Sequence, residues 1–330
     1  MEGVLDPLDQ ALLDDWQRDF PIQSEPFRVL GDALGLTQNQ VIDRLRRQMD
    51  NARITRVGAT CAPNTISAST LAAVAAPENR IEEVAAIIGA QPGVNHNYLR
   101  EHDWNLWFVA TGPDRAHVDA TLDRIEAQTG LRVLDLRLVR AFNVDLGFAL
   151  RGKTAAWKPA KAADPTAFQP GDRDILNNLM RGLQLVPRPY LAIAQDLGLS
   201  EATVLDRVRA LTQAGIVARL GIIVRHRALG WRSNAMVVWD MPSEQITRAG
   251  PVLAALPGIT LCYERTPVPG AWPYRLYSMI HARSRSDAMA VLTRACALPE
   301  LADVPHRPLF SLHCFKQTGA MVAPAQKEVA

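Results

Sequence analysis

Apolar residues recur at the three- and four-residue spacing of an amphipathic helix near the start of the chain and again near its middle. The first stretch contains Leu8, Leu12, Leu13 and Trp16, and the second contains Ile175, Leu176 and Leu179. A proline follows each stretch, at Pro26 and Pro189, and proline is well tolerated in the first turn of a further helix. The pattern therefore predicts two similar helical segments.

A glycine-containing turn follows in both segments. The triplet Leu-Gly-Leu precedes Thr37 in one and Ser200 in the other. Both residues are good N-caps, because their side-chain oxygen accepts a hydrogen bond from a free backbone N–H. Helices are therefore expected over 37–50 and 200–214, which gives the helix-turn-helix arrangement. Short strands ending near Gly58 and Gly221 are predicted to follow.

The rest of each half has the order strand, helix, strand, strand, helix, strand. In the first half we expect strands near 68–76, 94–101, 104–111 and 132–142, and helices near 78–90 and 114–129. In the second half we expect strands near 233–240, 258–265, 274–281 and 308–316, and helices near 243–256 and 285–297. This is the order of the split βαβ, ferredoxin-like domain.

The two halves are copies of one another. A shift of 163 residues overlays 5–58 on 168–221 without a gap. The chain is therefore predicted to be an α+β tandem duplication, each half a winged helix-turn-helix domain followed by a ferredoxin-like (βαββαβ) domain. The predicted domains are 1–60 and 61–149 in the first half, 168–224 and 225–319 in the second, with a linker over 150–167 and a disordered tail over 320–330.

Composition indicates an ordinary globular chain of 330 residues, 48% apolar and 21% charged. Its apolar runs are far shorter than the roughly 18 residues of a membrane span, and MEGVLDPLDQ does not resemble a signal peptide. The four cysteines lack CxxC spacing, so we expect free thiols and a cytoplasmic location. Residues 1–163 carry 18 basic and 21 acidic side chains, and residues 164–330 carry 18 and 13, so the basic second half suits an anionic ligand.

Polar and aromatic side chains alternate on several of the predicted strands. His96, Tyr98 and Arg100 are spaced by two, so they share one face of a strand. His102 follows at or beyond the next turn, and Trp107 lies on the strand after it. The second half places Tyr263 and Arg265 on the face that corresponds to Tyr98 and Arg100. Five further candidates are Arg225 and His226 after a short strand, Tyr274 and Arg275 at the start of another, and His281 at the far end of that strand.

Each candidate also has an ordinary structural explanation. His102 lies in Glu-His-Asp, a good polar hairpin tip, and His226 lies in an Arg-His-Arg run that solvent can accommodate. The matching Arg100 and Arg265 suit either anion binding or a shared structural salt bridge. The aromatic rings suit either packing against a flat ligand or burial in the core. The spacing alone leaves these alternatives open.

Several long motifs resemble a known family. A helix-turn-helix followed by a ferredoxin-like domain resembles the Lrp/AsnC regulators, which bind small effectors at a dimer interface. Five motifs, however, resemble the two subunits of siroheme decarboxylase joined in one chain: GVNHNYLREHDWNLWF at 93–108, VRHRALGWRSNAMVVW at 224–239, LCYER at 261–265, WPYRLYSMIH at 272–281 and FKQTG at 315–319. The second-half motif departs from the family pattern at Arg275, where asparagine is expected.

The resemblance implies that the chain removes two acetate carboxylates from siroheme to give 12,18-didecarboxysiroheme, for heme d1 or alternative heme biosynthesis. Decarboxylation needs an electron sink, which the macrocycle supplies, and a proton donor. No cofactor is therefore expected, because the siroheme iron belongs to the substrate. The site is expected between the two ferredoxin-like domains, with His96, His102 or His226 as catalytic proton donor. The expected substrate-binding residues are Tyr98, Arg100, Trp107, Arg225, Tyr263, Arg265, Tyr274, Arg275 and His281.

The main alternative is a fused Lrp/AsnC-type transcriptional regulator that senses a tetrapyrrole or an amino acid. A DNA reader usually presents Lys or Arg on its second helix. Here acidic residues accompany the few arginines, the chain has only five lysines, and Arg44 and Arg207 can pair with aspartates one turn away. We therefore expect no DNA binding and no membrane partner. A homodimer of the fused chain and other heme d1 biosynthesis proteins as partners are both compatible with the resemblance.

Overall fold

The structure is a computed structural model that describes residues 5–144, 147–148, 150–151 and 162–319. It divides into two compact units. Unit 1 contains both helix-turn-helix segments, and unit 2 contains both βαββαβ segments. The predicted tail 320–330 and most of the predicted linker 150–167 lie outside the described residues, and the predicted domain boundaries remain predictions. None of the helices in the described part of the chain is long and apolar enough to cross a membrane.

Unit 1 repeats three helices and one strand. The elements are α1 (Pro7–Asp15), α2 (Pro26–Leu34), α3 (Gln38–Asp50), β1 (Ile54–Cys61), α6 (Asp172–Arg181), α7 (Pro189–Leu197), α8 (Glu201–Gln213) and β6 (Val217–Val224). The Thr37 and Ser200 side chains cap α3 and α8 as predicted. Gly35 and Gly198 end the preceding helices with φ of 69° and 66°, a conformation that a residue with a Cβ rarely adopts. The strands β1 and β6 pair with each other and so join the two repeats.

Unit 2 contains the two βαββαβ segments that the sequence predicted. The first has β2 (Ala68–Val74), α4 (Ile81–Ala90), β3 (Val94–Arg100), β4 (Leu106–Gly112), α5 (Arg115–Thr129) and β5 (Val133–Asn143). The second has β7 (Ser233–Trp239), α9 (Ser243–Ala255), β8 (Ile259–Arg265), β9 (Leu276–Ala282), α10 (Arg285–Cys296) and β10 (His306–Gln317). The start of the helix predicted over 78–90 is instead a 3-10 turn, Glu78–Arg80, before α4 begins.

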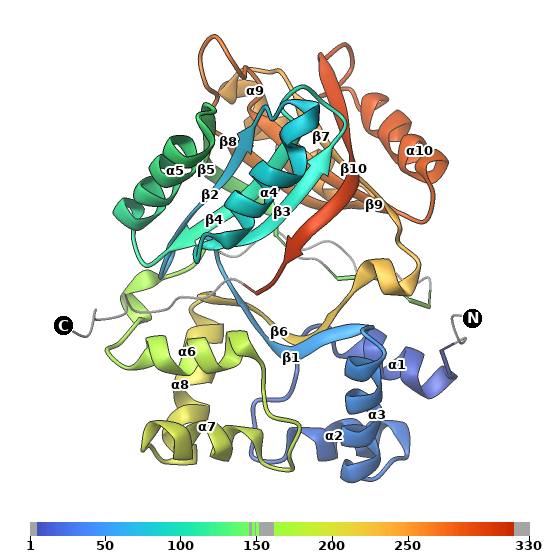
Figure 1. Ribbon diagram of the computed structural model, residues 1–330. Helices are drawn as coiled ribbons and strands as arrows, with labels where there is room; N and C mark the ends of the chain where they lie inside the picture. Colours follow the sequence, from blue (N-terminus) through green and yellow to red (C-terminus); the bar gives the residue numbers. More distant parts are fainter. Residues whose placement is uncertain (1–4, 145–146, 149, 152–161, 320–330) are drawn as a thin grey trace, which may run out of the picture. The chain divides into compact units, whose positions relative to one another are not determined.

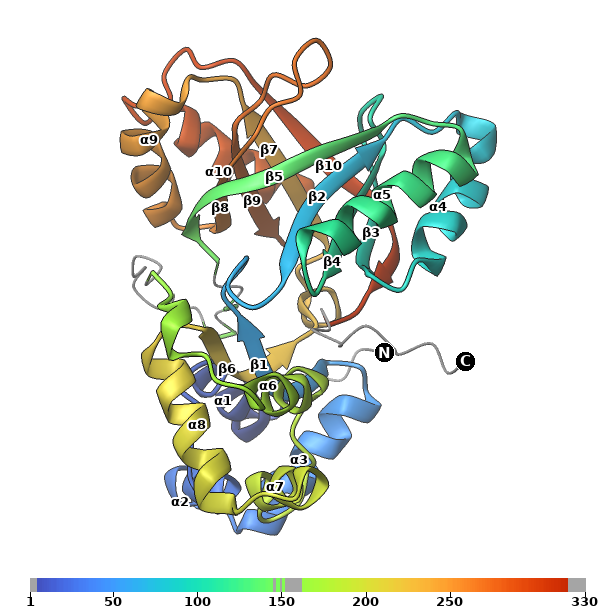
Figure 2. The ribbon, with the colours of Figure 1, turned by 90° about the vertical axis from the view of Figure 1, so that its left-hand side faces the viewer.

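Two long strands join the halves of unit 2 into a closed eight-stranded barrel. The first part of β5 pairs with β2 of its own half, and its second part, from Leu138, pairs with β8 of the other half. Likewise β10 pairs first with β7 and then, from Ser311, with β3. Figure 2 shows β5 running from β2 across to β8. Each half-sheet is therefore completed by a strand of the other half.

The barrel strands have two differently packed faces. Helices α4 and α5 cover the outer face of the first half, and α9 and α10 cover that of the second (Figure 1). Their apolar side chains form two separate cores. A third cluster comes from both halves at once and includes Leu134, Leu136, Met236, Val238 and Leu309. Because strand side chains alternate between faces, the residues of this third cluster point into the barrel.

Candidate active site

The three polar residues predicted to share a face of β3 do so. The rings of His96 and Tyr98 stack with centroids 6.3 Å apart and an interplanar angle of 22°. The Arg100 guanidinium lies 5.6 Å from the centre of the Tyr98 ring. The inward-facing side of this strand is therefore a row of one imidazole, one phenol and one guanidinium.

Arg100 links three strands inside the barrel. Its Nη1 donates to Oδ1 of Asn234 at 3.2 Å and to the carbonyl oxygen of Leu309 at 3.1 Å. Asn234 belongs to β7 and Leu309 to β10, so both acceptors come from the second half of the chain. Arg100 is buried, and these contacts anchor its guanidinium between the two halves.

Tyr263 and Arg265 repeat this arrangement on β8, as predicted. The Arg265 guanidinium lies 5.2 Å from the centre of the Tyr263 ring, and its Nη1 donates to the carbonyl oxygen of Leu136 at 2.9 Å. Burial lowers the pKa of Arg265 and raises the pKa of Tyr263 to about 12. Both side chains nevertheless keep some solvent-accessible surface. Tyr263 and Arg265 are therefore largely, but not fully, shielded from solvent.

An aromatic cluster with Trp272 at its centre joins the two halves. The Trp272 ring makes edge contacts with His102, Trp107 and Tyr274, with centroids 5.2, 5.1 and 4.9 Å away. Its Nε1 donates to the Tyr277 hydroxyl at 2.6 Å. Trp272 and Tyr277 were not among the site residues predicted from the sequence. The one signal for Trp272 was the length of the connection that contains it: ten residues separate β8 from β9, whereas five separate β3 from β4.

Tyr274 and Arg275 do not lie on the strand to which the sequence analysis assigned them. Strand β9 begins at Leu276, and both residues belong to the connection that precedes it. The Val268–Trp272 bridge folds this connection back on itself, and Gly270, with φ of 73°, allows the turn. His281 is near the end of β9, as predicted, and its Nδ1 lies 2.7 Å from the Thr260 hydroxyl oxygen.

The ring nitrogens of His96 and His102 have different partners. His96 Nδ1 lies 2.6 Å from Asn95 Oδ1, whose amide nitrogen donates to the Thr111 hydroxyl oxygen at 2.8 Å. An amide oxygen only accepts, so Nδ1 of His96 carries a hydrogen. In contrast, His102 Nδ1 accepts the backbone N–H of Trp104 at 3.0 Å. Burial lowers the pKa of His102, and both effects favour its neutral form.

Arg225 and His226 belong to unit 1. They follow β6 directly, as predicted; Arg225 is exposed, whereas His226 is buried. The His226 ring stacks on Phe148 with centroids 5.2 Å apart and an interplanar angle of 20°. Both rings of this pair lie within unit 1.

The arginines of the two helix-turn-helix segments are held by aspartates, but not by those of their own helix. Arg44 of α3 pairs with Asp6 and Asp9 at the start of α1, and Arg207 of α8 pairs with Asp172 at the start of α6. The predicted partners one turn away were therefore wrong, because the adjacent first helix supplies a better-buried carboxylate. These contacts leave both arginines committed within unit 1 rather than to phosphate.

Helices α3 and α8, the second helices of the two helix-turn-helix segments, also hydrogen-bond to the opposite repeat. Arg46 of α3 donates to the carbonyl oxygen of Leu185, and Arg209 of α8 donates to that of Ile22, at 2.8 and 2.9 Å. Arg46 and Arg209 therefore help to hold the two repeats together. Among the described residues, no group of three or more His, Cys, Asp or Glu side chains is arranged to hold a metal ion.

Two family models match the chain, each of them twice. The model of the AsnC-like ligand binding domain matches residues 66–143 and 228–316. The model of the siroheme decarboxylase NirDL-like HTH domain matches residues 9–54 and 172–217. The paired matches confirm the predicted duplication and the predicted α+β fold.

Known proteins of similar sequence and structure agree with these models. The siroheme decarboxylase NirDL subunit of Paracoccus denitrificans (strain Pd 1222) is 54% identical over 320 residues, 97% of this chain and 98% of the relative. The NirD subunit of the Stutzerimonas stutzeri enzyme is 49% identical over 146 residues, 44% of this chain and 96% of that subunit. A crystal structure of the siroheme decarboxylase NirDL matches with a TM-score of 0.70 and 25% identity, over 97% of this chain and 95% of that one. This chain therefore belongs to the siroheme decarboxylase NirDL family.

Proposed function

We propose that this chain is a carboxy-lyase that removes two acetate carboxylates from siroheme to give 12,18-didecarboxysiroheme, in heme d1 or alternative heme biosynthesis. The observation that carries the proposal is the 54% identity, over nearly the whole of both chains, to a siroheme decarboxylase. The alternative, a transcriptional regulator, does not account for this match. In this chain Arg44 and Arg207 of the helix-turn-helix segments also form ion pairs with aspartates of unit 1. The cytoplasmic location expected from the sequence is part of the proposal.

The chemistry needs few protein groups. The bond between the acetate methylene carbon and its carboxylate breaks, carbon dioxide leaves, and the electron pair stays on the methylene carbon, delocalised into the macrocycle. That carbon then takes a proton and becomes a methyl group. The protein must therefore hold the anionic substrate and deliver one proton for each acetate. We propose that it does so without a separate cofactor.

His96 is the best-suited proton donor of the three predicted histidines. Because its Nδ1–H is directed at Asn95, whose amide is oriented by Thr111, the exchangeable proton is on Nε2. A protonated His96 keeps the bond to Asn95, whereas a protonated His102 must lose the bond from the Trp104 N–H. We therefore assign the proton transfer to His96 and give His102 the role of holding the aromatic cluster in place. A role for His226 remains a prediction from the sequence.

The aromatic and cationic residues of the barrel are proposed to bind the macrocycle. Stacked rings such as Tyr98 offer flat surfaces to a tetrapyrrole, and Arg265 offers a cation to its carboxylates. Tyr274 and Arg275 lie on the connection between β8 and β9, beside the same aromatic cluster. The proposal extends to His281 and Arg225, for which the structure supplies a location but no further support. A homodimer and pathway proteins as partners also remain proposals.

The test is an anaerobic incubation of the purified chain with siroheme, followed by mass spectrometry of the extracted tetrapyrrole. Loss of two carbon dioxide units is expected. The variant His96→Gln should still change the absorbance of siroheme on binding but should release carbon dioxide at least about a hundredfold more slowly, the usual contribution of a general acid. Full turnover by His96→Gln would refute the assignment of the proton donor, and unchanged siroheme with the wild type would refute the function.

A further inference from the structure

The two halves of the barrel contain corresponding groups of three residues, which we call stations. The first station is Tyr98, Arg100 and Trp107, and the second is Tyr263, Arg265 and Tyr277. In the sheet, Tyr98 pairs with Trp107 and Tyr263 pairs with Tyr277, so the two stations have the same layout. Differences in their hydrogen bonding therefore show what each station is adapted to do.

In the first station, Arg100 Nη1 and the Trp107 indole both have acceptors within the protein. Arg100 Nη1 donates to Asn234 and to the Leu309 carbonyl oxygen. Trp107 Nε1 donates to the carbonyl oxygen of Trp104 at 2.7 Å. An indole has a single donor, so this bond uses all of its capacity. The first station thus behaves as an internal brace between strands.

The second station has donors left over. Arg265 Nη1 donates to the Leu136 carbonyl oxygen, but Nε is buried and finds no hydrogen-bond partner among the described residues. The Tyr277 hydroxyl accepts the Trp272 N–H, and its own hydrogen has no acceptor within the described ranges. The Arg265 guanidinium lies 5.9 Å from the centre of the Tyr277 ring. Two buried donors without acceptors, one of them cationic, therefore lie close together.

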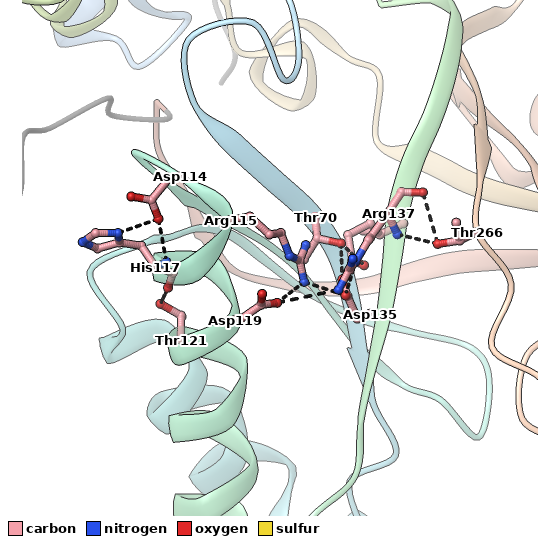
Figure 3. Close-up of polar contacts among 10 residues, drawn as sticks. Thr70, Asp114, Arg115, His117, Asp119, Thr121, Asp135, Arg137 and Thr266 are labelled. Carbon is pink, nitrogen blue, oxygen red and sulfur yellow. Dashed lines mark hydrogen bonds and ion pairs between the residues drawn. The ribbon is translucent and has the colours of Figure 1, made fainter.

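The carboxylate of Asp135, whose charge raises the pKa of Arg265, is held by other residues. Asp135 acts on Arg265 only through space. Its carboxylate accepts hydrogen bonds from the Thr70 hydroxyl, from Arg115 and from Arg137, at 2.6, 2.6 and 2.8 Å, as Figure 3 shows. Among the described residues, no carboxylate therefore forms an ion pair with Arg265, and its charge is available to an anionic ligand.

We propose that the second station is a carboxylate-binding subsite, in which Arg265 Nε and the Tyr277 hydroxyl donate to one side-chain carboxylate of the tetrapyrrole. This inference rests on the proposed function for the identity of the ligand. Trp272 acts as a positioning residue, because its N–H occupies a lone pair of the Tyr277 oxygen and directs the hydroxyl hydrogen elsewhere. The first station has Trp107 in place of Tyr277, and the only donor of that indole is used inside the protein, so a carboxylate held by Tyr277 fixes which way round the macrocycle binds.

The experiment is a titration of the full chain with iron-uroporphyrin III, followed by absorbance. Tyr277→Phe removes the hydroxyl and keeps the ring, and it should weaken binding roughly ten- to a hundredfold, the effect of one hydrogen bond to a charged group. The matched control is Tyr190→Phe, which removes a buried hydroxyl that donates to Pro21 O in unit 1, and it should bind as the wild type does. Arg265→Gln should weaken binding further.

A second ligand identifies the carboxylate. Iron-coproporphyrin III keeps the propionates and has methyl groups in place of the acetates. If the subsite holds an acetate, Tyr277→Phe loses affinity for iron-uroporphyrin alone; if it holds a propionate, it loses affinity for both. Wild-type affinity of Tyr277→Phe for both ligands, or an equal loss in Tyr190→Phe, would overturn the proposal. Binding that depends on Tyr277 without carbon dioxide release from siroheme would instead refute the proposed function and leave the subsite intact.

Discussion

Removing the Asp172 carboxylate should destabilise unit 1 more than removing that of Asp9, its counterpart in the first repeat. Asp172 is 2% exposed and accepts from Arg207 through both oxygens, at 2.9 and 2.7 Å, and from the Gln169 backbone N–H at 2.7 Å. Asp9 accepts from Arg44 through one oxygen, and Arg44 also pairs with Asp6. Asp9→Ala therefore leaves its arginine with a carboxylate partner, Asp6, whereas Asp172→Ala leaves Arg207 with none.

The expected difference follows from this contrast. Removing one partner of a fully buried ion pair costs about 3–5 kcal/mol. The Arg207 side chain is 19% exposed and keeps its bond to the Ala167 carbonyl oxygen, so we expect about 2–4 kcal/mol for Asp172→Ala. For Asp9→Ala we expect about 1–2 kcal/mol, the loss of a charged hydrogen bond with a substitute available.

Differential scanning calorimetry of the full chain measures both effects. At about 2–4 °C for each kcal/mol, Asp172→Ala should lower the unfolding transition of unit 1 by roughly 4–16 °C and Asp9→Ala by roughly 2–8 °C. The transition assigned to unit 2 should not move in either variant. Equal decreases, or a larger one for Asp9→Ala, would show that Asp6 does not replace Asp9 and that the argument from the pairing geometry is wrong.

Three further outcomes are expected. Glu264 is 1% exposed and accepts hydrogen bonds from Arg140 and from the Ser243 hydroxyl, each at 2.5 Å. Glu264→Gln should lower the free energy of unfolding of unit 2 by about 2–3 kcal/mol, less than for a fully buried pair because Arg140 is part-exposed. The same calorimetric scans measure this loss. The lowered pKa of His102 means that the unfolded chain binds the proton more tightly. Stability should therefore rise with pH up to about 6.5, and His102→Asn should flatten that rise in thermal melts. Gel-shift assays at low salt should show no retention of duplex DNA, and salt-dependent, sequence-selective binding would contradict the scaffold role of unit 1.

The sequence predicted most elements within one or two residues, because local chemistry marks their ends. Thr37 and Ser200 cap the helices that were expected after them. The strand carrying His96, Tyr98 and Arg100 was recognisable because alternate residues share a face, and that geometry depends on the strand alone. Predictions that need only neighbouring residues therefore agree with the structure.

Predictions that depend on distant partners were less complete. The partners of Arg44 and Arg207 lie 35 to 38 residues earlier in the chain, and periodicity within a helix does not indicate them. Trp272 was missed because it belongs to an irregular connection, whose path is set by the bridge to Val268 rather than by a repeating pattern. Tyr277 was missed because a buried aromatic on a strand usually belongs to the core. Only its hydrogen bonds distinguish it.

The exchange of strands explains why neither half of the barrel can build its inner surface alone. The acceptors of Arg100 come from β7 and β10, and the acceptor of Arg265 comes from β5 of the opposite half. Both guanidinium groups are therefore positioned only when the halves are paired. Once the halves are fused, each changes without altering the other, so Trp107, whose single donor is used inside the protein, can stand where the other half has Tyr277, whose hydroxyl accepts from Trp272. Duplication thus supplies two matching sets of residues, and divergence between Trp107 and Tyr277 makes the two sides of the barrel chemically different.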